Sequence, residues 1–155
     1  MLQVLLTLHI LGAVVFVGNI ITAAFWKARA DRSGDLHAIA FTARSLVQAD
    51  LSFTTPGIIV LLATGTAMVG ITDWTRFQET WLSISFVLLI ITAIIWFVGL
   101  LPLQKRMRRI SQDSVTAGVL DPEYTRAGKQ WAMFGGIATL LPIIILFLMV
   151  LKPGI

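Results

Sequence analysis

The stretch WLSISFVLLIITAIIWFVGLLPL, residues 81–103, decides the fold because no charged side chain interrupts it. An α-helix needs about 20 apolar residues to cross roughly 30 Å of hydrocarbon. Residues 3–25, 51–71 and 131–151 form three further runs of this kind. Helices that are apolar on every face would aggregate in water, whereas a bilayer buries them. The sequence therefore predicts an all-α, polytopic membrane protein, with one four-helix domain over residues 1–155.

The composition supports a membrane class. Hydrophobic residues make up 57% of the chain and charged residues only 13%, whereas about a quarter of the residues in soluble domains are charged. The first run is followed by basic residues, but it lacks the basic region that precedes a signal peptide's apolar core. We therefore interpret it as a transmembrane helix. The absence of cysteine excludes disulfides, iron–sulfur ligation and thiol catalysis.

The basic residues predict the orientation, because Lys and Arg near helix ends resist translocation. Arg76 and Lys152 stand apart from the other basic residues, which lie in the connections after the first and third helices: Lys27, Arg29, Arg32, Arg44, Lys105, Arg106, Arg108, Arg109, Arg126 and Lys129. Those two connections are expected in the cytoplasm, and both termini outside. The expected location is the inner membrane of a bacterial cell.

The net charge of +4 has a membrane explanation, because the basic residues flank the spans and match an anionic inner leaflet. We therefore expect membrane lipids as partners and no nucleic acid. The run Lys105, Arg106, Arg108 and Arg109 is the strongest candidate for a lipid-headgroup site. The simpler interpretation, which we favour, is that this run only sets the topology.

Three sequence features predict the ends and interruptions of helices. Apolar residues recur with helical spacing from Leu36 to Val47, so helix two is expected to start near Asp35 and to extend into the cytoplasm. Pro56 followed by Gly57 predicts a kink. Asp121 before Pro122 is typical of a helix start, so helix four is expected to run to about Lys152 and also to extend into the cytoplasm. Residues 111–120 lack an apolar rhythm and are expected to be a connection.

Small residues at Gly128, Ala132 and Gly136 form a stripe on helix four that another helix can approach closely. Packing within the chain is the favoured interpretation. A homodimer and a partner within a membrane complex remain open as assemblies.

Polar groups at membrane depth are the candidates for function, because they are costly to bury there. His9 and Asn19 share one stripe of helix one with Gly12, Phe16 and Ala23. Asp50 lies near the inner end of helix two, with Arg44 and Lys27 as expected charge partners. Ser83 and Ser85 are further intramembrane polar groups in helix three.

His9 is the sharpest candidate, because imidazole can bind haem or a metal ion or transfer protons near neutral pH. His37 cannot share an iron with it, since the rest of helix one alone extends about 25 Å beyond His9. Met68 and Met149 lie at a suitable depth for a second ligand, which would suit haem b or copper. The alternative is that His9 is an interfacial histidine that only forms a hydrogen bond with a neighbour.

The segment Leu8-His9-Ile10-Leu11-Gly12-Ala13 with Gly18, followed by Trp26-Lys27-Ala28-Arg29, resembles a family of four-span bacterial membrane proteins that is known only as a domain of unknown function. The resemblance extends through Ala49-Asp50, residues 54–57 and Thr64-Gly65. The chain is also distantly similar to the membrane protoporphyrinogen oxidase (HemJ) and copper-resistance (CopD) families, which share a first-helix histidine followed by a glycine. The HemJ resemblance implies a role for His9 in haem binding, but residues 81–85 have serines where that family has a histidine and a lysine.

Two hypotheses of function follow, and the sequence does not decide whether the protein is an enzyme. In the first, the protein is a redox protein that binds haem or another tetrapyrrole, with His9 as an axial ligand. In the second, it is a non-enzymatic membrane module, either an assembly partner or a component that handles copper or another metal.

Overall fold

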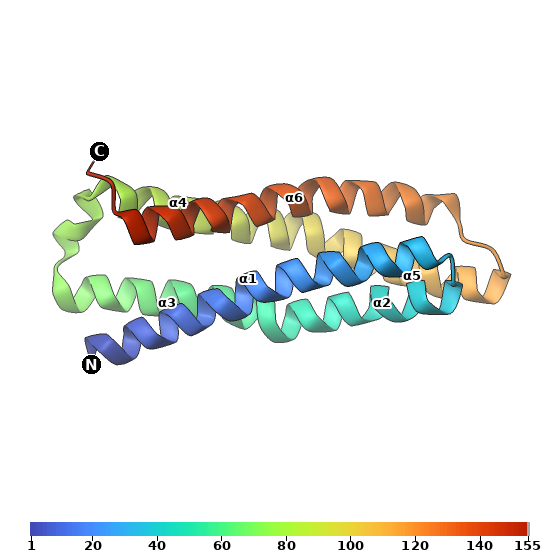
Figure 1. The fold of residues 1–155 in the computed structure, drawn as a ribbon, viewed down its shortest axis with the longest axis horizontal. Helices are drawn as coiled ribbons and strands as arrows, with labels where there is room; N and C mark the ends of the chain where they lie inside the picture. The colour runs from blue at the N-terminus through green and yellow to red at the C-terminus, as the bar shows by residue number, and fades with distance from the viewer. Residues whose placement is uncertain (155) are drawn as a thin grey trace.

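A computed structural model describes residues 1–154, which form four long helices in an antiparallel bundle (Figure 1). Helix one is α1 (Leu2–Ser33). Helix two comprises α2 (Leu36–Ala49), a π-helical turn η1 (Asp50–Thr54) and α3 (Thr55–Thr72). A short 3-10 helix η2 (Trp74–Gln78) leads to helix three, which comprises α4 (Thr80–Ile94), a second π-helical turn η3 (Ile95–Leu100) and α5 (Leu101–Ala117). Helix four is α6 (Pro122–Leu151).

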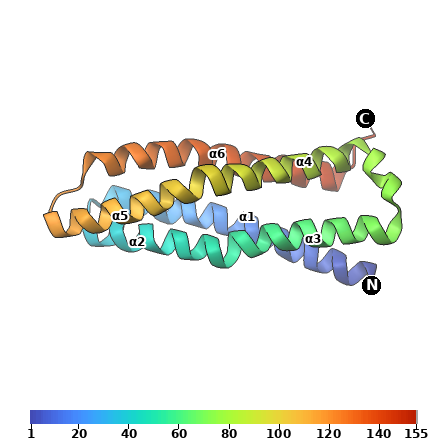
Figure 2. The ribbon, with the colours of Figure 1, turned by 180° about the vertical axis from the view of Figure 1, so that it is seen from behind.

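All four helices are long and apolar enough to cross a membrane, which confirms the predicted fold class of a four-helix membrane bundle. Their outer surfaces are apolar, as lipid requires: Val14 is 64% exposed, Val98 74% and Phe147 60%. Both termini lie at one end of the bundle, which we call the terminal end (Figures 1 and 2). We call the opposite end, with the turns at Gly34 and Gly118, the basic end.

Every helix is longer than the hydrocarbon layer requires. Helix three, at 38 residues, extends for roughly 57 Å, against about 30 Å of hydrocarbon. We expected only helices two and four to continue past the membrane, and residues 111–120 to form a connection. That expectation was incomplete, because α5 continues to Ala117. Its buried face contains polar side chains that an apolar rhythm does not reveal: Gln104, Ser111 and Ser114 beside Met107 and Ile110.

Two predicted helix starts are confirmed. The Asp35 side chain accepts a hydrogen bond from the His37 amide at the start of α2, and the exposed ring of His37 fits a solvated position. The Asp121 side chain accepts from the Glu123 amide, with Pro122 in the first turn of α6. Each aspartate thereby satisfies an amide that the first helical turn leaves without a partner.

Near Pro56 the helix is interrupted by the π-helical turn η1, from which only Thr55 separates the proline. A second proline, Pro102, follows the π-helical turn η3 with only Leu101 between them. Proline has no amide hydrogen and its ring clashes with the carbonyl four residues earlier, so a wider turn relieves the strain. Each π turn also shifts the angular position of every side chain beyond it.

Glycines allow α1 and α3 to cross closely. A Cβ atom added to Gly57 would lie 2.9 Å from the Phe16 Cβ atom and 3.3 Å from the Gly12 carbonyl oxygen. A Cβ atom added to Gly12 would lie 3.0 Å from the Val60 side chain. This crossing brings the polar stripe of α1 against helix two.

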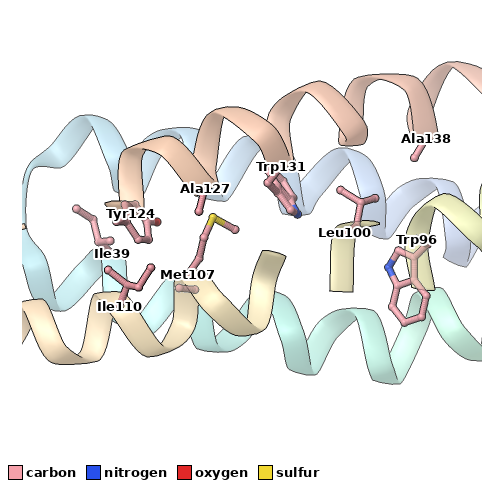
Figure 3. Close-up of a cluster of buried hydrophobic side chains, with 10 residues drawn as sticks. Ile39, Trp96, Leu100, Met107, Ile110, Tyr124, Ala127, Trp131 and Ala138 are labelled. Carbon is pink, nitrogen blue, oxygen red and sulfur yellow. The ribbon is translucent and has the colours of Figure 1, made fainter. Parts of the chain in front are cut away.

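The interior consists of two apolar clusters. The larger lies toward the basic end, where aromatic and aliphatic side chains of η3, α5 and α6 meet (Figure 3): Trp96, Leu100, Met107, Ile110, Tyr124, Ala127 and Trp131 among them. The smaller lies toward the terminal end and joins Phe16, Ile58, Leu61 and Leu89. Trp96 is 3% exposed and belongs to the larger cluster.

Candidate functional site

One face of α1 presents polar side chains to the other helices, as the sequence predicted for His9 and Asn19. Gly12, Phe16 and Ala23 of the same stripe are buried. Both polar residues contact helix two: His9 through α3 and Asn19 through η1. Further toward the basic end, α1 contributes the buried Lys27.

His9 is held from one side by α3. Its Nδ1 atom lies 2.8 Å from the Thr64 hydroxyl oxygen, and the Thr64 hydroxyl also lies 2.5 Å from the Val60 carbonyl oxygen. The single threonine proton can go to only one of these two acceptors, and when it goes to the Val60 carbonyl, the threonine oxygen accepts from His9 Nδ1–H. The other ring nitrogen, Nε2, then has its lone pair available. Gly65 leaves room for the ring, because a Cβ atom there would lie 3.3 Å from His9 Cε1.

The two candidate second ligands are both half-buried, in the terminal half of the bundle. Met68 lies one helical turn beyond Thr64 and therefore on the same face of α3. Met149 lies near the end of α6. Ligation by either one stays a prediction. Among residues 1–154, no group of three or more His, Cys, Asp or Glu side chains is placed to share a metal ion.

Asp50 is the centre of the most extensive polar network among the described residues. It is 5% exposed, and each of its carboxylate oxygens accepts two hydrogen bonds. Oδ1 accepts from Asn19 Nδ2 and Thr54 Oγ1, both at 2.7 Å. Oδ2 accepts from Trp96 Nε1 at 3.1 Å and Gln104 Nε2 at 2.6 Å. The network therefore ties helices one, two and three together near mid-bundle.

The expected charge partners of Asp50 were wrong. Lys27 pairs with Asp31 on its own helix, and Arg44 is exposed. Nearness in sequence suggested charged partners, but the actual donors are neutral side chains. Two of them, Trp96 and Gln104, were not recognised as site residues. Trp96 shares one signal with Asp50, a proline at the same offset: Pro56 comes six residues after Asp50 (56 − 50) and Pro102 six after Trp96 (102 − 96). Gln104 has no such signal.

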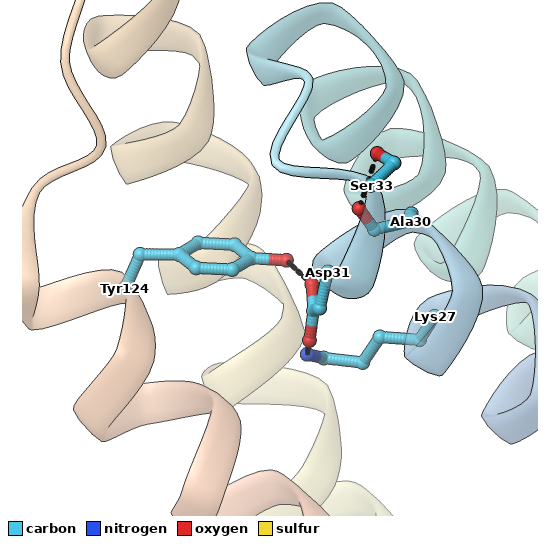
Figure 4. Close-up of polar contacts among 5 residues, drawn as sticks. All are labelled: Lys27, Ala30, Asp31, Ser33 and Tyr124. Carbon is cyan, nitrogen blue, oxygen red and sulfur yellow. Dashed lines mark hydrogen bonds and ion pairs between the residues drawn. The ribbon is translucent and has the colours of Figure 1, made fainter.

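A second polar group lies nearer the basic end (Figure 4). Asp31 accepts a hydrogen bond from the Tyr124 hydroxyl at 2.9 Å, and its other oxygen lies 2.5 Å from Lys27 Nζ. Lys27 is 4% exposed and its ammonium lies 5.2 Å from the Tyr124 ring centroid and 5.6 Å from that of Trp131. The charge of Lys27 is thus balanced by one carboxylate and two aromatic faces.

A cavity of about 810 Å³ lies between α1 and α6, and we call it the α1–α6 cavity. Its lining includes members of both networks: Asp50 and Gln104 of the first, and Lys27, Asp31 and Tyr124 of the second. The stripe Gly128, Ala132 and Gly136 forms part of its α6 wall. Only Gly128 of the stripe packs within the chain. Ala132 and Gly136 are exposed, so the favoured interpretation of packing within the chain is wrong for these two residues. Gly128 abuts Lys27 Nζ, whereas a Cβ atom on Gly136 would meet nothing within 4 Å.

The comparison with protein families matches a family model described as predicted integral membrane protein (DUF2269), over residues 3–153. The chain belongs to the DUF2269 family. Neither the search of curated proteins nor the search of solved structures found a match. The family match and the four long apolar helices together establish a multi-pass integral membrane protein. The likeness to the HemJ and CopD families stays a prediction.

In this DUF2269 protein the remaining predicted residues lie outside both networks. Ser85 donates to the Trp81 carbonyl and Ser83 to the Phe77 carbonyl, so these hydroxyls are satisfied by nearby backbone. The predicted headgroup residues Lys105, Arg106, Arg108 and Arg109 are all exposed on α5, and Arg106 pairs with Glu123 of α6. A lipid-headgroup role for these residues stays a prediction.

Proposed function

We propose that the protein is a redox protein of the bacterial inner membrane that binds haem b or a related tetrapyrrole near its terminal end, with His9 as an axial ligand. The observation that carries the proposal is the hydrogen bond between His9 Nδ1 and Thr64. Histidines that ligate iron usually donate from the second ring nitrogen to a fixed partner, which orients the ring and leaves Nε2 for the metal.

The donor set fits a haem better than a zinc ion. A six-coordinate haem needs two axial ligands, and a histidine with a methionine is an established pair. Met68, on the face of α3 that meets His9, is the first candidate for the second ligand, and Met149 is the other. When bound, haem iron exchanges single electrons. The role of this chain would be to hold the His9 imidazole in one tautomer and at one depth in the membrane.

The test is the absorption spectrum of the detergent-purified protein from haem-sufficient cells. We expect a Soret band in the native protein that is lost or shifted in His9→Ala. His37→Ala is the matched control, because it removes the exposed histidine at the basic end, and it should leave the band unchanged. Thr64→Val keeps the shape of the side chain but removes the acceptor for Nδ1, so it should shift the band or lower its occupancy. A colourless native protein would refute the proposal.

The second candidate function is a non-enzymatic membrane module, such as an assembly partner or a component that handles copper. It is favoured by the same contact, since a bond to Thr64 satisfies Nδ1 of the half-buried His9 imidazole without any cofactor. In that case His9→Ala would destabilise the bundle without changing its spectrum or metal content. Copper analysis of the purified native protein separates the metal version from the assembly version.

A further inference from the structure

We propose that the α1–α6 cavity binds a lipid-soluble hydroquinone, and that its ring hydroxyl bonds to Gln104 and Trp131. The site is distinct from His9 and does not depend on the proposed haem. At about 810 Å³ the cavity lies within the range of roughly 300–1,000 Å³ typical of small-molecule sites.

The first step of the argument is a pair of buried polar atoms that lack partners. Among the described residues, Gln104 Oε1 and Trp131 Nε1 are buried without a hydrogen bond. Both residues line the cavity, and they are 1% and 9% exposed. Figure 3 shows the Trp131 ring directed from α6 into the bundle. Buried polar atoms are nearly always paired, so this acceptor and this donor point to a ligand.

The orientation of Gln104 is fixed by its neighbour. Its Nε2 atom donates to Asp50 Oδ2 at 2.6 Å. Turning the amide over would place the glutamine oxygen against a carboxylate oxygen, and neither atom can donate. The cavity therefore offers one acceptor, Gln104 Oε1, and one donor, Trp131 Nε1–H.

A hydroxyl group matches this pair, because it donates one hydrogen bond and accepts others at the same oxygen. A quinone carbonyl would satisfy only Trp131, and an ammonium only Gln104. The charged side chains of the lining are Lys27 and Lys129 against Asp31 and Asp50, and Lys27 is already paired with Asp31. The lining therefore carries no net charge that would favour an ionic head group. The preferred head group is thus neutral and carries a hydroxyl.

The remaining lining favours a flat ring on an apolar tail. Four aromatic side chains line the cavity: Phe16, Trp96, Tyr124 and Trp131. Aromatic rings associate with other rings in stacked or edge-on arrangements. Gly135 and Gly136 line the cavity from α6 without side chains, and both lie within the predicted span of helix four. A hydroquinone with a long apolar tail combines the ring, the hydroxyl and the solubility in lipid.

The test is the binding of decylubiquinol, kept reduced, to the purified native protein in nanodiscs, measured by equilibrium dialysis. We expect saturable binding at one site per chain, at least ten-fold weaker for the oxidised quinone. Gly136→Leu should abolish binding, because it fills the cavity from a position with open space around its Cβ. The matched control is Gly18→Leu, which is equally open but lies outside the cavity, and it should bind normally.

A second pair of variants tests the hydrogen bond itself. Trp131→Phe keeps an aromatic ring and removes only the donor, so it should weaken quinol binding about ten-fold. Trp26→Phe, at an exposed position outside the cavity, should not change binding. No saturable binding to the native protein, or unchanged binding by Gly136→Leu, would overturn the proposal. Tightly bound phosphatidylglycerol that decylubiquinol fails to displace would also overturn it, by identifying the hydroxyl-bearing ligand as a phospholipid.

Discussion

Gly57→Ala should destabilise the bundle more than any other exchange of a helical glycine for alanine among the described residues. The new Cβ atom would lie 2.9 Å from the Phe16 Cβ atom, whereas ordinary contacts begin at 3.4 Å. Neither neighbouring atom can rotate away, because one is a Cβ atom and the other, the Gly12 carbonyl oxygen, is backbone. The helices α1 and α3 must therefore separate by about half an ångström, and such overpacking typically costs about 1–3 kcal/mol.

The cost should extend to the polar contacts on either side of the crossing. The bonds from His9 to Thr64 and from Asn19 to Asp50 are 2.8 and 2.7 Å long, and both join α1 to helix two. Separating the helices lengthens both bonds toward the limit of useful geometry at about 3.2 Å. The expected loss is therefore nearer the upper end of the 1–3 kcal/mol range.

The assay is equilibrium unfolding in mixed micelles of mild detergent and dodecyl sulfate, followed by circular dichroism. Gly18→Ala is the control, because the new Cβ atom there meets nothing within 4 Å. Both variants gain the helix propensity of alanine, up to about 1 kcal/mol, so the difference between them isolates the crossing. Equal free energies of unfolding for Gly57→Ala and Gly18→Ala would refute the close crossing of α1 and α3.

Three further predictions test the Asp50 network, the connection between helices two and three, and the orientation. Asp50→Asn should cost about 1–3 kcal/mol, because its new amide group would face donors instead of accepting from them; Ser45→Ala, on exposed α2 surface, is the control in the same unfolding assay. The Thr75 backbone amide donates to Asp73 and lowers the pKa of this carboxyl below its ordinary value. The bond should therefore persist above pH 3.8 and be lost as pH falls through the lower pKa of the folded state. The NMR chemical shift of the Thr75 amide would report this loss. A Thr75 amide shift that already changes above pH 5 would contradict the prediction. Alkaline phosphatase fused after residue 155 should be active, since we predict that the terminal end lies outside; activity only in a fusion within residues 118–121 would show the opposite orientation.

The parts of the fold that the sequence predicted are those governed by local chemistry. The spans follow from long uncharged runs, and the helix starts follow from Asp35 and Asp121, whose side chains act on amides two residues away. The inward face of α1 was also predictable. Gly12 and Phe16 share the angular position of His9 and Asn19 along a regular helix, so one geometric rule places all four.

The partners of Asp50 depend on geometry that the sequence does not state. A π turn on each of two helices sets the angular positions of Asp50 and Trp96, so regular 3.6-residue periodicity misplaces side chains beyond them. The end of helix three was misjudged for a related reason. Ser111 and Ser114 are buried on α5 although neither is apolar, and a search for apolar periodicity cannot detect a face made partly of serine.

The same geometry explains why the cavity lies beside Asp50. The carboxylate draws Trp96 and Gln104 toward helix two, since both donate to Oδ2. The α6 residues that line the same cavity include Gly135 and Gly136, which have no side chains to fill it. Larger residues at these two positions would fill that space. A polar side chain there could also donate to Gln104 Oε1, which would satisfy this oxygen without a ligand. The fold thus uses one buried carboxylate to join helices one, two and three. The fourth helix, α6, packs against helix three through the larger apolar cluster and leaves the α1–α6 cavity beside Asp50.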